Sequence, residues 1–98
     1  MHIIRVLLTV KPEEKEAFIT HLNQEAAAVK QNFSGCEKFG LFIDATDENG
    51  FLLYEEWESQ QHFNAYRESD LFKQNGAKLF PMMAGKPDSA YFSAELAM

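Results

Sequence analysis

The sequence has little of what marks several large protein classes. Only one of its 98 residues is a cysteine, so no disulfide can form within the chain, which is typical of a reducing compartment. Lys and Arg number 9 against 15 Asp and Glu, and these cations form no cluster. Proteins that bind nucleic acid or anionic membranes need such a cluster, so we expect neither as a partner.

Long hydrophobic runs are also absent. No apolar stretch approaches the roughly 20 residues that span a bilayer. The apolar segment 1–8 is too short for a secretion signal with its cleavage site. We therefore expect a cytoplasmic protein.

Sequence motifs for cofactors are missing as well. The histidines, His2, His21 and His62, have no metal-ligand spacing to one another or to Cys36. The chain has no glycine-rich phosphate loop and no Gly-x-Ser-x-Gly nucleophile motif. From these absences we expect a protein that uses no cofactor and no metal.

Aromatic residues are plentiful by contrast. Nine Phe, three Tyr and one Trp occur in a chain that is 46% hydrophobic. They can fill a core or line an apolar pocket.

The first half of the chain reads as a strand followed by a helix. Residues 2–10 are rich in β-branched and aliphatic types and predict a strand. Pro12 with the acids after it is typical of a helix start, and Ser34-Gly35 of a stop. One apolar stripe predicts a helix to about residue 32 and consists of Phe18, Leu22, Ala26, Val29 and Phe33.

The second half predicts three more strands and two short helices. Segments 36–44 and 51–58 read as strands joined by a hairpin, with Asn49-Gly50 as its turn because both residues tolerate positive φ. Residues 89–96 alternate and predict the fourth strand. Between them, Ser59 caps a helix with Phe63 and Tyr66, Ser69 caps one with Phe72, Gly76, Leu79 and Met83, and Pro81 kinks or ends the second.

This order predicts a ferredoxin-like α+β fold, βαββαβ, with a four-stranded antiparallel sheet and helices on one face. The strands do not alternate cleanly between apolar and polar residues. Leu7, Phe42, Leu52 and Tyr54 stand on the parity opposite to the other apolar residues of their strands. Both faces of the sheet then need cover, so we expect a homodimer packed sheet to sheet.

Strand 51–58 and the residues after it carry a pattern found in a known family. Gly35-Cys36 stands before the second strand, where that family often has Gly-Cys. The pattern is Phe-x-Leu-x-Glu-x-Trp in 51–57, followed by Ser59, Phe63, Ser69 and Phe72. On these residues the sequence resembles the antibiotic biosynthesis monooxygenase (ABM) domain from His2 to about Leu96, and we expect one such domain over residues 1–98.

The resemblance implies a dimeric α/β barrel with a cleft between sheet and helices that takes flat, electron-rich aromatics. Some members oxygenate quinols or polycyclic anthrones with dioxygen and no cofactor. Many have a histidine where this chain has Tyr66. Haem-degrading members have Asn, Trp and His at positions that look like Ile4, Tyr66 and Gly76, so haem degradation is not expected here.

Glu55 and Trp57 are the first candidates for catalysis. Glu55 alternates with apolar neighbours, so it is either a base in an enclosed space or half of an ion pair, with Arg5 as the candidate partner. Trp57 shares the parity of Glu55, so it either stacks on a substrate or packs in the core or dimer interface.

Tyr66 is the third catalytic candidate, with His62, Arg67 and Phe72 as candidates for substrate binding. His62 and Tyr66 stand four apart on one helix face, so they either exchange a proton at the cleft mouth or are simply solvated and half-buried. Arg67 can hold an anionic oxygen or be a surface charge. Phe72 belongs to the apolar face of the second short helix.

Three functions remain open from the sequence. The first is a cofactor-independent monooxygenase for a quinol-like or polycyclic aromatic molecule, with dioxygen as cosubstrate. The second is an isomerase on a small phosphorylated sugar, because Lys78-Leu79 through Met83-Ala84-Gly85 resembles a branch of the family with that substrate; Arg67, Lys73 and Lys78 would supply the cations. The third is a non-enzymatic dimer that binds aromatic ligands.

Overall fold

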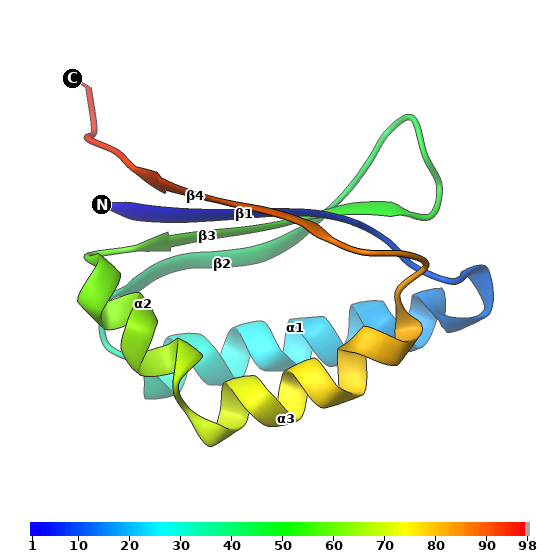
Figure 1. Ribbon diagram of the computed structural model, residues 1–98, viewed down its shortest axis with the longest axis horizontal. Helices are drawn as coiled ribbons and strands as arrows, with labels where there is room; N and C mark the ends of the chain where they lie inside the picture. The colour runs from blue at the N-terminus through cyan, green and yellow to red at the C-terminus, as the bar shows by residue number, and fades with distance from the viewer. Residues whose placement is uncertain (98) are drawn as a thin grey trace.

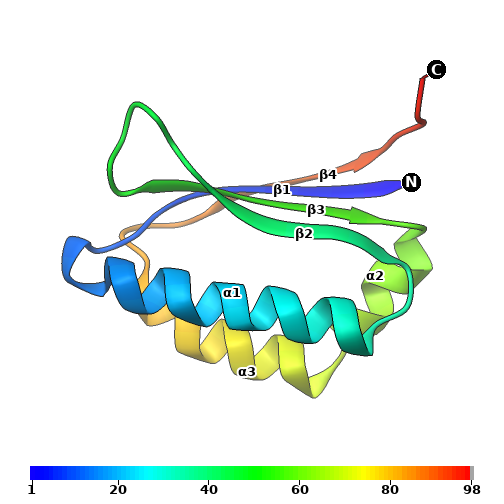
Figure 2. The same cartoon turned by 180° about the vertical axis from the view of Figure 1, so that it is seen from behind.

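The computed structural model describes residues 1–97, which form a sheet and a layer of helices on one of its faces (Figures 1 and 2). The strands pair antiparallel in the order β2-β3-β1-β4. This confirms the ferredoxin-like α+β fold. In chain order the elements are β1 (His2–Thr9), α1 (Lys15–Asn32), β2 (Cys36–Ile43), β3 (Gly50–Trp57), α2 (Gln60–Arg67), α3 (Asp70–Leu79) and β4 (Asp88–Ser93).

The helices begin and end where local chemistry predicts. Pro12 opens a short 3-10 turn that leads into α1. The hydroxyl oxygens of Ser59 and Ser69 each accept a backbone N–H bond, from His62 and Phe72 respectively, both at 3.2 Å. Helix α3 ends before Pro81, which lies in a 3-10 turn, because proline cannot donate the next helical hydrogen bond.

Two details of the sequence prediction are wrong. The turn between β2 and β3 does not use positive φ at Asn49 or Gly50, since the only described residues with positive φ are Gly35 and Gly85. Instead the carboxylate of Asp44 accepts from Thr46 N–H at 2.8 Å, and that of Asp47 from Asn49 N–H at 3.0 Å. Side chains that bond to their own backbone close this loop.

The fourth strand is also shorter than predicted. It ends at Ser93 rather than at residue 96. Ser93 pairs with His2, and the N–H of Ala94 bonds to the Met1 carbonyl at 2.9 Å. Beyond that point β1 has no residue left to pair with.

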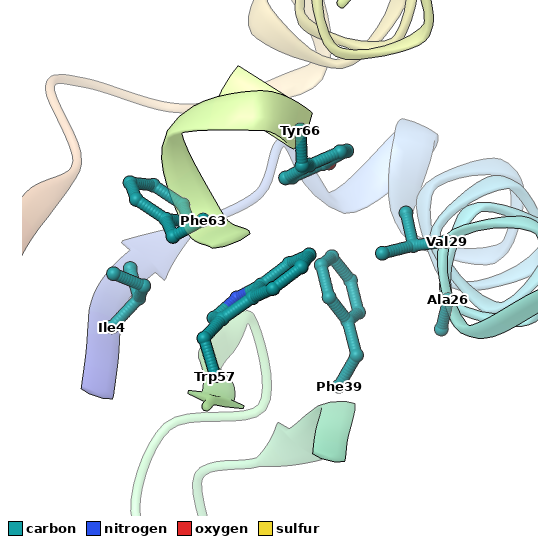
Figure 3. Packing of buried hydrophobic residues seen from close by; sticks show 7 residues of the cluster. All are labelled: Ile4, Ala26, Val29, Phe39, Trp57, Phe63 and Tyr66. Carbon is teal, nitrogen blue, oxygen red and sulfur yellow. The ribbon is translucent and has the colours of Figure 1, made fainter. Parts of the chain in front are cut away.

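The core lies between the sheet and the helices in two adjoining clusters. One surrounds Trp57, Tyr66 and Phe39 at the α2 end (Figure 3). The other surrounds Phe18 and Phe51 at the opposite end. Ile4, Glu55 and Phe39 are paired in register across three strands, so the same sheet face that carries the core also carries Glu55.

The other face of the sheet is left open by the helices (Figures 1 and 2). Phe42, Leu52 and Leu7 stand side by side on it in register. Phe42 is 49% exposed and Leu7 is 42% exposed. No helix within residues 1–97 has the length and apolar character needed to cross a membrane.

Candidate functional site

A cavity of about 180 Å³ lies between the sheet and the helices. Strand β1 lines it with Ile4, Val6 and Leu8, and α1 with Phe18 and Leu22. Side chains of β3, β4, α2 and α3 complete the wall, which is mostly apolar. Such a lining excludes water and strengthens any electrostatic interaction inside.

The mouth of the cavity lies between β4 and α3. Tyr91 of β4, Phe72 of α3 and Phe80 just after it line the cavity and are exposed to solvent as well. Both elements bound the near side of the molecule in Figure 1. Gly76 of α3 also lines the cavity, and a Cβ added to it would meet nothing within 4 Å. The wall of the cavity at Gly76 is therefore open enough to take a larger side chain.

Glu55 is a buried carboxyl group in the wall of this cavity, only 4% exposed. Its Oε1 accepts a hydrogen bond from the indole N–H of Trp57 at 2.9 Å. Burial raises the pKa of Glu55 to about 7, the Trp57 bond offsets part of that rise, and the charge of Glu25 adds to it. The proposed ion pair with Arg5 does not form, because Arg5 lies on the opposite parity of β1 and pairs with Asp88 at 3.7 Å.

Trp57 is completely buried and does not line the cavity. Its ring is stacked on that of Tyr66, with centroids 5.5 Å apart and planes at 17° (Figure 3). The indole therefore acts on the cavity through Glu55, which it orients. This geometry matches a core tryptophan better than one that touches a ligand.

Tyr66 lines the cavity with its ring and donates its hydroxyl to Oε2 of Glu25. Phe33, Phe39 and Phe72 approach the same ring edge-on. Burial, together with the charge of Glu25, raises the pKa of the Tyr66 hydroxyl well above its ordinary value. Tyr66 is therefore a neutral hydrogen-bonding group at any physiological pH.

His62 and Arg67 lie outside the cavity wall, whereas Phe72 is part of it. The Nδ1 atom of His62 lies 2.7 Å from the Ser59 hydroxyl, and its ring packs so closely over Gly35 that a Cβ there would clash. The predicted proton exchange between His62 and Tyr66 is thus not supported by the geometry. Arg67 reaches the mouth only indirectly, with its guanidinium 5.9 Å from the ring centroid of Tyr91.

Glu25 of α1 is the site residue that the sequence analysis missed. It is 7% exposed and lines the cavity beside Tyr66. Burial raises its pKa, and hydrogen bonding from Tyr66, the nearby Asn75 amide and the charge of His21 lower it in part. Within residues 1–97, Oε1 of Glu25 and Nδ2 of Asn75 each have no partner at hydrogen-bond geometry. The signal was its spacing, since Glu25 stands three residues after Leu22 and so falls on the apolar stripe.

The fold and this site define a small α+β domain with an enclosed apolar cavity and two carboxyl groups in its wall. Residues 1–77 match the profile of the family described as antibiotic biosynthesis monooxygenase (ABM). The chain belongs to this family. The description of the family supports a general role for its members as oxygenases.

Solved structures agree with this assignment. A "putative antibiotic biosynthesis monooxygenase" from Caulobacter crescentus is 29% identical, has a TM-score of 0.92, and the match covers 97% of this chain and 90% of that one. A protein of the same name from Nitrosomonas europaea is 20% identical with a TM-score of 0.87, over 96% and 98% of the two chains, and supports the fold alone.

A curated relative is longer than this chain. The uncharacterized protein sll1783 from Synechocystis is 29% identical over 80 residues, which are 82% of this chain. The match spans only 53% of that protein.

Proposed function

We propose that the protein is a monooxygenase that acts without a cofactor on a quinol-like aromatic molecule, with dioxygen as cosubstrate. The observation that carries the proposal is Glu55, a carboxyl group in an apolar cavity with a pKa of about 7. A base whose pKa lies near the working pH is the most effective at taking a proton in the transition state. A phenolic hydroxyl is the natural proton donor for such a group.

The size of the cavity favours a small substrate. Its 180 Å³ is close to the roughly 150 Å³ of an engineered cavity that takes up benzene. A single substituted ring fits that space, whereas a polycyclic anthrone would need the mouth between β4 and α3 to open. The structure therefore favours the quinol-like substrate over the polycyclic one.

The chemistry needs only groups that this cavity has. Glu55 takes the proton of the substrate hydroxyl, and the resulting electron-rich anion can pass an electron directly to dioxygen. Recombination forms a carbon–oxygen bond, and the O–O bond then breaks with loss of water. Hydroquinone and dioxygen give hydroxyquinone and water, so the substrate loses four electrons and dioxygen gains them. Enclosure protects the anion and the reduced oxygen from side reactions with water.

Within this proposal the candidate residues divide by position. Glu55 is the base, and Phe72 stacks on the substrate ring at the mouth. Tyr66 donates its hydroxyl proton to Glu25, so it offers the substrate only its hydroxyl oxygen, as an acceptor. Trp57 orients Glu55. His62 and Arg67 do not touch the substrate and are removed from the binding set.

The charge of the wall argues against the sugar-phosphate isomerase. The charged residues that line the cavity in the described part of the chain are both carboxyl groups, and Arg67, Lys73 and Lys78 are not among its lining residues. A phosphate would be repelled there. In the alternative of a non-enzymatic dimer, the aromatic ligand would bind in the same cavity but would not be converted to product.

Oxygen consumption tests the proposal. Purified, metal-free protein is mixed with hydroquinones of one and two rings, and uptake is measured against the spontaneous rate. We expect uptake that falls at least about 100-fold in Glu55→Gln, falls in Trp57→Phe and Tyr66→Phe, and persists in Tyr54→Phe, whose hydroxyl bonds to Glu56 on the open face. Saturable binding without uptake would establish the ligand-binding alternative, and no binding would refute both.

We further propose that the open sheet face packs against a second copy of the chain. Three large apolar residues from three strands, Leu7, Phe42 and Phe92, are each more than two-fifths exposed on it. A monomer rarely leaves such a patch to solvent. An isologous dimer would cover it without using the cavity mouth, which faces the helix side.

A further inference from the structure

We propose that Glu25 is a positioning residue of this site: it fixes the Tyr66 hydroxyl and shares one proton with Glu55, so that the cavity holds a single negative charge near neutral pH. This inference rests on the proposed function for its chemical purpose, although the shared proton can be measured without any turnover.

The geometry brings two carboxyl groups into one small apolar space. Glu25 comes from α1 and Glu55 from β3, and both line the same cavity of about 180 Å³. Each has one oxygen engaged by a fixed donor, the Tyr66 hydroxyl and the Trp57 indole respectively. Those two donors are stacked ring on ring. The four side chains thus form one packed unit, in which Oε1 of Glu25 is buried with no hydrogen-bond partner among residues 1–97.

Two carboxyl groups in such a space cannot both ionise easily. The charge of Glu25 raises the pKa of Glu55, in addition to the larger effect of burial. No Lys or Arg in the described part of the chain lines the cavity to compensate. Like charges in a low dielectric titrate as a pair with two shared steps, and one proton is retained over a wide pH range.

The titratable groups that face the pair from β1, β2, β4 and α2 supply no cation at neutral pH. Burial raises the pKa of the Cys36 thiol on β2 to about 11. Burial also raises the pKa of the Tyr66 hydroxyl on α2. His2 of β1 lies opposite Trp57 in register, and burial lowers its pKa. Tyr91 of β4 lines the cavity, and α3 contributes the uncharged Asn75 amide beside Glu25. His21, one turn before Glu25 on α1, is the one group that opposes the charge of Glu25.

The shared proton suits the proposed reaction. When the shared proton lies on Glu25, a substrate hydroxyl transfers its proton to the ionised Glu55, so one O–H bond breaks and another forms. The cavity then holds the substrate anion and two neutral carboxyl groups, and its net charge is unchanged. Were both carboxyl groups ionised beforehand, the substrate anion would form next to a remaining carboxylate.

The fluorescence of Trp57 offers a direct test, because it is the only tryptophan in the chain and donates to Glu55. We expect wild-type emission to change with a midpoint near pH 7 and the change to vanish in Glu55→Gln. In Glu25→Gln the repelling charge is gone, so the midpoint of the fluorescence change should fall by roughly half a pH unit or more. His2→Gln is the control for the histidine that is paired with Trp57 in the sheet, and it should leave the midpoint in place. An unchanged midpoint in Glu25→Gln, or no wild-type transition, would overturn the proposal.

A second measurement needs no variant that could misfold. In wild-type protein labelled at the glutamate side-chain carboxyl carbon, NMR should show Glu25 and Glu55 titrating in two common steps. Two independent single steps would overturn the pairing. If hydroquinone turnover is found, the acidic limb of kcat/KM should move down in pH with the fluorescence midpoint in Glu25→Gln. If the protein consumes no oxygen but the fluorescence midpoint still falls in Glu25→Gln, the proposed function is refuted and the carboxyl pair is established.

Discussion

At the scale of single residues, Glu55 couples the site to the stability of the whole domain. Its pKa rises from 4.5 in the reference state to about 7 in the fold, so the folded protein binds this proton more tightly. The resulting stabilisation, about 3 kcal/mol, is complete below pH 4.5 and is lost as the pH rises through about 7. Glu55→Gln cannot ionise, so its unfolding free energy should decline less than the wild type's between about pH 5 and about pH 8. Denaturant titrations across that range measure both slopes, and equal slopes would contradict the assignment.

Tyr66 provides the second test at this scale, because Tyr54 is its natural control. Both hydroxyls donate to a glutamate, but only the Tyr66–Glu25 bond is buried. Tyr66→Phe leaves a buried carboxyl without its donor and should cost about 1–3 kcal/mol of unfolding free energy. Tyr54→Phe removes a hydrogen bond that is only partly buried within the chain, and should cost less. Equal losses in urea denaturation would show that Glu25 is solvated after all.

The same residues show what sequence could and could not provide. Strand parity placed Glu55 and Trp57 on the same face of the sheet but could not tell whether that face lies under the helices or in a dimer interface. In the structure it lies under the helices. Parity could not tell that Trp57 is fully buried while Glu55 reaches the cavity, because both side chains point the same way. Glu25 was missed because an acid on an amphipathic helix usually belongs to its solvated face, and only the position of its hydroxyl donor, Tyr66, in space explains its burial.

At the scale of elements, Gly76 is the position on α3 where a substitution can change the volume of the cavity. A Cβ there meets nothing within 4 Å, so Gly76→Ala should gain about 0.5–1 kcal/mol by lowering the backbone entropy of the unfolded chain. Gly76→Leu should also fold, but its side chain would fill the space needed by a ligand. Thermal melts with and without hydroquinone separate the two effects. A Gly76→Leu protein that still binds the ligand would show that the cavity is not the binding site.

The elements were predicted well where a local signal fixes them. Pro12, Ser59 and Ser69 marked helix starts because each satisfies or removes a backbone donor at that place. The turn at Asn49-Gly50 was assigned to the wrong mechanism, since Asp44 and Asp47 close the loop with their side chains. The end of β4 depends on its pairing with β1, and pairing partners are not visible in a single strand's sequence.

At the scale of the whole molecule, two layers give the domain two different faces. The helix side holds the cavity, whose lining is exposed to solvent between β4 and α3. The sheet side presents Leu7, Leu52 and Phe42 in one row, with Phe92 further along. A sheet of this kind with one solvated face usually alternates between apolar and polar residues. The failure to alternate is therefore the pattern expected of a sheet that is covered on both faces, as the proposed dimer requires.

Phe42 tests that assembly most sharply, because Phe80 is a matched control on the opposite side. Phe42→Glu places a charge in the centre of the proposed sheet-to-sheet interface, where it would be buried without a partner. Phe80→Glu makes the same exchange at a residue that is 61% exposed near the cavity mouth. By sedimentation we expect about twice the chain mass of 11.2 kDa for the wild type and for Phe80→Glu, and the chain mass alone for Phe42→Glu. A wild-type protein that sediments as a monomer at micromolar concentration would rule out the dimer and leave the apolar row as an unpaired surface.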